Sequence, residues 1–180
     1  MGRILASSRA EKEALFIELG DELFAEYAKD GEMPPDMFHW MCRTLVTTAY
    51  ELFVLDIRRL EILLIRRPAD DPEWPNQLHS PGTVILPGET FETARDRLIA
   101  REIRIGLSAP IFVKAHRFPK SNIHPRDEVN LQHVAVAHSQ PSHGAFYSLD
   151  DLPESEMVSH HVVMAKFLRR WLHVHSPALF

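Results

Sequence analysis

The stretch from Pro81 to Glu102, PGTVILPGETFETARDRLIARE, places a turn rich in glycine and proline directly before a helix. A short apolar run ends at Pro87-Gly88, and Ala94 and Leu98 then lie four residues apart, which is helical spacing. Because a helix brings residues three and four apart onto one face, charged side chains of this helix can gather beside the turn. The stretch therefore predicts a turn and a helix that could together face phosphates and a metal ion.

Short apolar runs lie on both sides of this stretch and predict strands. Residues 51–56 and 61–66 are joined by a short polar link, the pattern of a hairpin, and their continuous apolar character predicts burial on both faces. Further strands are expected over 77–80, 111–118, 129–138 and 146–148, and a C-terminal helix over 159–173. Strands with one helix among them and another at the end predict an α/β layered domain.

The first 47 residues predict a helical extension. Ser8 and Glu11 have the spacing of a capping box, and apolar residues recur every fourth position from Leu15 to Tyr27, so a helix is expected to run to about Lys29. Pro34-Pro35 is expected to open a second, shorter helix. The predicted domain organisation is a helical N-terminal extension over residues 1–47 and one α/β domain over residues 48–180.

Composition narrows the class of protein. The 180 residues carry 20 Lys and Arg against 25 Asp and Glu, a formal charge of −5 without a long basic run, so nucleic acid is not an expected partner. No apolar run approaches the length of a membrane span and the N-terminus lacks a signal-peptide core, so no membrane partner is expected. The single cysteine, Cys42, excludes an internal disulfide and is expected to be buried. A cytoplasmic protein is predicted.

The stretch resembles the Nudix box, which is a glycine, five residues, a glutamate, seven residues and then Arg-Glu-apolar-x-Glu-Glu-x-Gly. Placing Glu89 on the first glutamate puts Thr83 at the glycine position, with Gly82 just before it, and Arg97 on the arginine. Two of the helix acids are absent, because Leu98 and Arg101 occupy their positions. Glu102 keeps the last one. The resemblance implies a Nudix-like α/β/α sandwich with a mixed sheet.

The loss of acids looks like that of the GDP-mannose mannosyl hydrolase branch, which has Arg-Leu in place of Arg-Glu. The resemblance implies a single Mg²⁺, with Mn²⁺ as an alternative, held by Glu102 and by a carbonyl at Gly82 or Thr83. By the same resemblance, Arg97 would face phosphate and His143 would be the general base. Glu89 is a possible helper, and the loop from Gly82 to Gly88 would lie against the phosphates of a nucleoside-diphosphate derivative such as a nucleotide sugar.

Each assignment has an alternative. Glu102 could be a solvated helix acid, Arg97 could brace Glu89, and His143 could be an exposed loop residue. Arg66 and Arg67, at the end of a predicted strand, could bind phosphate or keep a sheet edge soluble. His160-His161 could suggest a metal site, but a solvated helix is expected there because neighbouring helix residues point apart.

Two functions therefore remain open. The first is a Mg²⁺-dependent hydrolase of a nucleoside-diphosphate-linked compound. The second is an inactive Nudix-fold module for ligand binding or protein interaction, as the loss of acids at Leu98 and Arg101 would allow. The apolar extension must cover its own domain or a second copy, and a homodimer is predicted.

Overall fold

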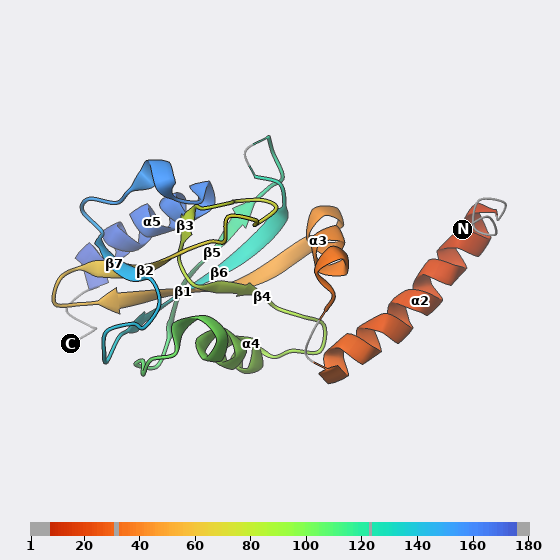
Figure 1. Cartoon of the computed structure of the whole chain (residues 1–180), viewed down its shortest axis with the longest axis horizontal. Helices are drawn as coiled ribbons and strands as arrows, with labels where there is room; N and C mark the ends of the chain where they lie inside the picture. Colours follow the sequence, from red (N-terminus) through yellow and green to blue (C-terminus); the bar gives the residue numbers. More distant parts are fainter. Residues whose placement is uncertain (1–7, 31–32, 123, 176–180) are drawn as a thin grey trace.

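The central strand of the molecule is β1, Val46–Asp56, in a seven-stranded mixed sheet (Figure 1). The computed structural model describes residues 8–30, 33–122 and 124–175. The other strands are β2 (Glu61–Arg66), β3 (Leu78–His79), β4 (Gly82–Val84), β5 (Ile111–Phe118), β6 (Asp127–Val136) and β7 (Ala145–Ser148). The helical elements are α2 (Arg9–Asp30), α3 (Pro35–Thr44), α4 (Phe91–Leu98), the π-helical turn η1 (Ile99–Ile103), the 3₁₀ turn η2 (Glu154–Glu156) and α5 (Ser159–His175).

Pairing around β1 makes the sheet mixed. The main strand order is β3-β2-β1-β6-β5, with β4 also paired to β1 and β7 to β2. β1 runs parallel to β6 from Val46 opposite Asp127 to Leu55 opposite Val136, whereas its pairs with β2 and β4 are antiparallel. The predicted hairpin of β1 and β2 is confirmed. β1 begins at Val46, two residues inside the predicted extension, and β4 is a strand where only a turn was expected.

Both faces of the sheet are covered, as the continuous apolar character of β1 predicted. Phe53 and Leu55 pack into one core with α5, whereas Leu52 and Val54 pack into a second core with α4 and η1. The α5 side chains of the first core are Met164, Ala165, Leu168 and Leu172. Adjacent strand residues point to opposite faces, so one strand supplies both cores. The predicted α/β/α sandwich is confirmed.

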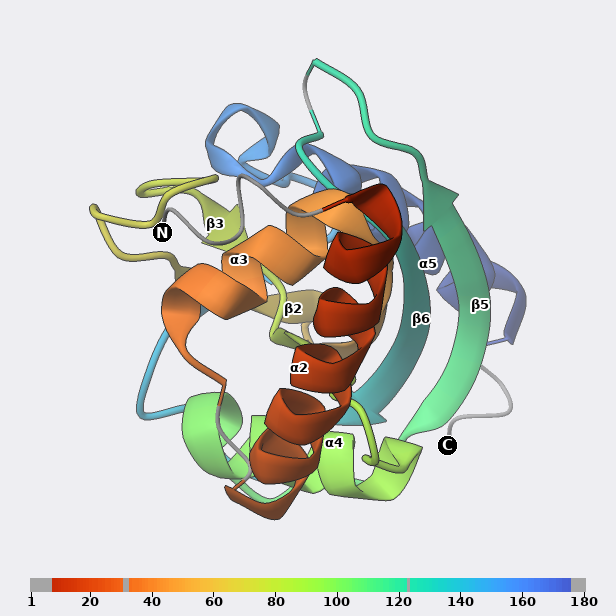
Figure 2. The same cartoon turned by 90° about the vertical axis from the view of Figure 1, so that its right-hand side faces the viewer.

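The N-terminal helices lie at one end of the sheet, and α2 extends away from the body of the molecule (Figures 1 and 2). The capping box at Ser8 is confirmed, since the Ser8 amide donates to Glu11 Oε2 over 2.7 Å and the Glu11 amide to Ser8 Oγ over 3.3 Å. Phe16 of α2 reaches Trp40 of α3, with ring centroids 5.9 Å apart. Many apolar side chains of α2 stay exposed, and the side chain of Tyr27 lies outside the described part.

α3 is attached to the domain through a small core. Met41 and Cys42 pack against Val84 of β4, so the thiol is buried as predicted. Burial raises the pKa of Cys42 to about 11. In the described residues, no helix combines the length and the apolar character that crossing a bilayer requires.

Candidate functional site

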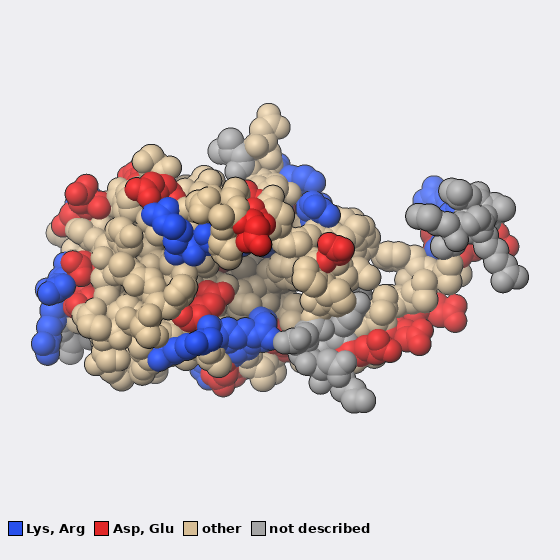
Figure 3. Space-filling model, in the orientation of Figure 1, with Lys and Arg blue, Asp and Glu red and all other residues tan. Residues whose placement is uncertain are grey.

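A cavity of about 510 Å³ lies where β1, β4, η1, β6 and α5 meet, and α3 also lines it. Its lining is rich in charged and imidazole side chains: His39, Glu51, Arg67, His79, Arg97, Arg101, Glu102, Arg126, Glu128, His160 and His161. On the molecular surface the same face is hollowed, and basic side chains form a band over α4 beside acidic ones (Figure 3). The cavity therefore offers both cations for phosphate and carboxylates for a metal ion.

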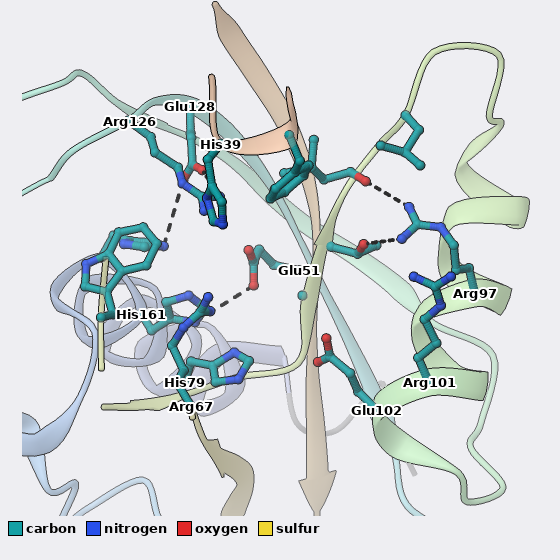
Figure 4. A pocket seen from close by; sticks show the side chains of 18 of the residues that line it. His39, Glu51, Arg67, His79, Arg97, Arg101, Glu102, Arg126, Glu128 and His161 are labelled. Carbon is teal, nitrogen blue, oxygen red and sulfur yellow. Dashed lines mark hydrogen bonds and ion pairs between the residues drawn. The ribbon is translucent and has the colours of Figure 1, made fainter. Parts of the chain in front are cut away.

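Glu51 is a deeply buried acid of the cavity. Its carboxylate projects from β1 toward the middle of the cavity (Figure 4), and the residue is 5% exposed. Oε2 has no hydrogen-bond partner among the described residues, and His161 Nδ1 lies 3.9 Å from it. Burial, reinforced by the negative charges of Glu128 and Glu102, raises the pKa of Glu51 well above its ordinary value. An unpartnered buried carboxylate oxygen is costly and calls for a cation or a proton.

Gly82 leaves room for this carboxylate. Gly82 of β4 pairs with Glu51 of β1, and a Cβ on Gly82 would lie 2.3 Å from Glu51 Oε2. A side chain at position 82 would therefore require the Glu51 carboxylate to shift. The glycine at the start of the box thus makes the space into which Glu51 points.

Glu102 enters the same cavity from η1. The switch from α-helix to π-helix at Ile99 places both Arg101 and Glu102 in the cavity lining. π-turns of this kind are frequent at functional sites. Burial raises the pKa of Glu102 to about 7, although the Gly82 amide and nearby arginines act in the other direction. Its Oε2 is a second buried carboxylate oxygen without a hydrogen-bond partner among the described residues.

Arg97 braces the box. Its Nε and Nη2 donate to the two carboxylate oxygens of Glu89 over 2.7 and 2.8 Å, and its Nη1 donates to Thr83 Oγ1 over 2.7 Å. A further bond of 2.9 Å from Nη2 reaches the Val84 carbonyl. Arg97 also lines the cavity. The structure thus brings together the predicted residues Arg97, Glu89 and Thr83, in the bracing arrangement that was the alternative to phosphate binding.

Other predicted residues are dispersed. Arg67 lines the cavity and is paired with Asp71 over 2.6 Å. Arg66 is not part of the cavity lining and pairs with Glu156. Gly88 has a positive φ of 82° that suits the turn, but neither it nor His143 is part of the cavity lining. His143 is exposed in the loop before β7.

Buried histidines form the wall opposite η1. The prediction of a solvated helix at His160-His161 is wrong, since each is 4% exposed at the start of α5. Burial lowers the pKa of each well below its ordinary value, and that of His79 to about 4. His161 Nδ1 accepts a hydrogen bond from the Ser80 amide over 3.2 Å. These rings are tightly packed, with centroids of His160 and His161 4.3 Å apart.

Sequence reasoning missed Glu51, Glu128 and the role of the α5 histidines. Glu51 is the single acid inside the apolar run Tyr50–Leu55. A charged residue in a buried strand is rare unless it is paired, so its position indicated a special role. Glu128 alternates with apolar residues along β6 and gives no such signal. The burial of His160 and His161 together depends on where α5 meets β3 and β6, which periodicity does not report.

The cavity residues fit a hard divalent cation. Mg²⁺ prefers oxygen ligands, one or two carboxylates with waters and substrate phosphates. Glu51 and Glu102 each present an unpartnered buried oxygen to the cavity (Figure 4). They are the residues that would hold the ion.

Solved structures of Nudix hydrolases share this fold. A hydrolase from Nitrosomonas europaea has a TM-score of 0.56 and 12% identity, covering 71% of this chain and 73% of its own. One described as a MutT Nudix hydrolase, from Burkholderia pseudomallei, has a TM-score of 0.53 and 20% identity, covering 68% and 97%. A bifunctional NMN adenylyltransferase/ADP-ribose pyrophosphatase from Francisella tularensis has a TM-score of 0.50 and 15% identity, covering 82% and 46%.

No protein-family model matches the sequence. No curated protein matches it either. At these identities the likeness concerns the fold, and the chain has the fold of the Nudix hydrolases.

Proposed function

We propose that this protein is a Mg²⁺-dependent hydrolase of nucleoside-diphosphate-linked compounds, such as nucleotide sugars, working with a reduced Nudix box. The observation that carries the proposal is the pair of buried, unpartnered carboxylate oxygens of Glu51 and Glu102 in one cavity. Glu51, supplied by β1, compensates for the box acids that Leu98 and Arg101 replace. Mn²⁺ would suit the same oxygen ligands.

The residues around these carboxylates have separable tasks. Arg67 and Arg101 line the cavity and would hold the diphosphate, since guanidinium groups bind phosphate oxygens well. Arg97 is a positioning residue that fixes the turn through Glu89 and Thr83. A bound Mg²⁺ would offset phosphate charge and stabilise the leaving group. Glu51 and Glu102 would hold that ion against the substrate.

The test is turnover of a panel of nucleotide sugars and other nucleoside-diphosphate derivatives by the full chain, with and without Mg²⁺. We expect Glu102→Gln and Glu51→Gln each to lower kcat/KM by about 100-fold, since each removes charge from the ion's cradle. Glu92→Gln is the matched control, because Glu92 is an exposed acid in the first turn of α4. It should leave turnover unchanged.

The helix acid that is missing at position 98 cannot be restored there without repacking, because Leu98 is 1% exposed in the core.

The turnover test has two informative outcomes. If no nucleoside-diphosphate derivative is consumed and Glu102→Gln leaves ligand binding unchanged, the chain is an inactive Nudix-fold module. If turnover occurs, ¹⁸O-labelled water distinguishes attack at the sugar carbon, the GDP-mannose mannosyl hydrolase chemistry, from attack at phosphorus.

We also propose that the protein is a cytoplasmic homodimer. The exposed apolar side chains of α2 include Phe16 and Ile17, which are 60% and 62% exposed, and a second copy would cover them. The single buried thiol, Cys42, suits a reducing compartment. Light scattering of the full chain tests the dimer, and a monomeric mass would overturn it.

A further inference from the structure

A second group of ligand-type side chains lies in and behind the wall of buried histidines opposite η1, here called the histidine wall, away from the box. His124 precedes β6, Glu128 belongs to β6 and His160 lies in the first turn of α5. His124 Nε2 lies 3.6 Å and His160 Nε2 4.0 Å from the same oxygen, Glu128 Oε2. The three side chains are 6%, 4% and 4% exposed. We propose that His124, Glu128 and His160 bind a transition-metal ion of the zinc class, distinct from the Mg²⁺ proposed at Glu51 and Glu102.

The hydrogen bond of His124 fixes which of its nitrogens faces the acid. His124 Nδ1 lies 2.7 Å from the Arg126 carbonyl, and a carbonyl only accepts, so Nδ1 carries the proton. In the neutral ring Nε2 then presents a lone pair to Glu128 Oε2. This Nε2 is buried without a hydrogen-bond partner among the described residues. Two acceptors that face each other in the interior require a metal cation or a proton between them.

The surroundings hold the ligands in place. A backbone carbonyl orients His124, and Arg126 Nη1 lies 3.3 Å from Glu128 Oε1, which leaves Oε2 for the metal. Such outer partners are typical of histidine-containing metal sites. The charge of Arg126 is shared with Glu73, with which it forms a second ion pair. The local charge therefore does not exclude a cation.

The distances suit the ion. At Zn–N and Zn–O bond lengths of about 2.1 Å, ligand atoms of a tetrahedral site lie about 3.4 Å apart. The three ligand atoms lie within 4.8 Å of one another, so side-chain shifts of under about an ångström would close the site. Two imidazoles and one carboxylate favour Zn²⁺ and its neighbours over Mg²⁺. Glu128 and His160 line the cavity, so an ion could reach the site from it.

A rival group contains Glu51, His160 and His161. His161 Nδ1, the nitrogen 3.9 Å from Glu51 Oε2, already accepts the Ser80 amide hydrogen. Its lone pair is therefore in use. We favour the group with His124 for this reason.

The test is metal binding by the full chain after treatment with a chelator, which needs no activity. Titration calorimetry with Zn²⁺ should give one ion per chain with a Kd on the order of 1 μM or below. His124→Gln, Glu128→Gln and His160→Asn should each weaken binding by at least about tenfold. His173→Asn, at an exposed position of the same helix, is the control and should bind as the wild type does.

Two further measurements keep the test decisive. Circular dichroism checks that each variant is folded, and X-ray absorption of the Zn²⁺-loaded wild type should show scattering from two imidazoles. The proposal is overturned if the wild type binds no Zn²⁺. It is also overturned if only oxygen ligands are seen, or if Glu51→Gln abolishes binding while Glu128→Gln does not. Wild-type binding with unchanged affinity in all three ligand variants overturns it as well.

Discussion

The two walls of the cavity differ in how their residues come together. The box wall draws Gly82, Thr83, Arg97 and Glu102 from one continuous stretch, with Glu51 added from the neighbouring strand. The histidine wall draws single residues from a loop, a strand and the start of α5. In Figure 4 the carboxylates of Glu51 and Glu102 lie between the arginines of one wall and the histidines of the other.

The two walls also differ in the ions that their side chains can bind. The box wall presents oxygen ligands and guanidinium groups, which suit Mg²⁺ and phosphate. The other wall presents imidazole nitrogens around Glu128, which suit a softer ion. A local motif can be found from spacing, whereas a dispersed cluster exists only after folding.

The largest expected effect is that of Gly82→Ala, which forces Glu51 of the box wall to move. The new Cβ would overlap the Glu51 carboxylate, so we expect a loss of about 3 kcal/mol in the free energy of unfolding, the upper range for overpacking. Urea denaturation measures it. Gly20→Ala is the control, because nothing lies within 4 Å of that Cβ in α2, and it should be neutral or stabilising. Equal effects at both glycines would contradict this expectation.

Breaking the pair between Glu89 and Arg97 should lower the free energy of unfolding somewhat less. Glu89→Gln breaks the paired bonds from Arg97, and we expect a loss of about 2 kcal/mol in unfolding free energy near neutral pH. Burial acts to raise the pKa of Glu89, but hydrogen bonds from Arg97 and the Leu86 amide outweigh it, and the pKa is lowered.

A lowered carboxyl pKa sets the sign of the pH dependence. The stabilisation by Glu89 is fully present above its unfolded-state pKa and is lost as the pH falls through the lower folded-state pKa. The wild type and Glu89→Gln should therefore converge in stability in acid. If the difference in unfolding free energy between the two proteins were undiminished at low pH, the charge of Glu89 would contribute nothing to stability.

Metal selectivity can test the separation of the two walls. Glu102→Gln should raise the Mg²⁺ concentration needed for half-maximal turnover by about tenfold, or about 1.4 kcal/mol, and leave the Zn²⁺ affinity unchanged. Glu128→Gln should do the reverse. Titrations of both ions against both variants measure this. If each substitution weakens the binding of both ions equally, the two walls form one metal site.

The smallest effect is expected at His143. This residue is exposed and does not contribute to the cavity lining, so we expect His143→Asn to change kcat by less than about threefold. Loss of a true general base costs about 100-fold or more. Steady-state kinetics across neutral pH is the measurement. A drop of that size would restore His143 to the chemistry and require the loop before β7 to close over the cavity.

The sequence alone determined the fold class and the box side of the site. The apolar runs of β1 and β2, the turn at Gly88 and the helical spacing after it are local patterns, and each is set by residues near one another in the chain. The spacing from Gly82 to Glu102 was enough to place a glycine and an acid at one cavity. The pairing of Arg97 with Glu89 was one of the two interpretations of Arg97 that the spacing left open.

Only the tertiary structure decided the rest. It placed Glu51 against Gly82, buried His160 and His161 together and left His143 outside the cavity lining. These outcomes depend on strand pairing and on where α5 crosses the sheet, which are long-range choices made by packing. Burial then changed the chemistry, because a side chain's pKa and its need for a partner depend on what surrounds it in space rather than along the chain.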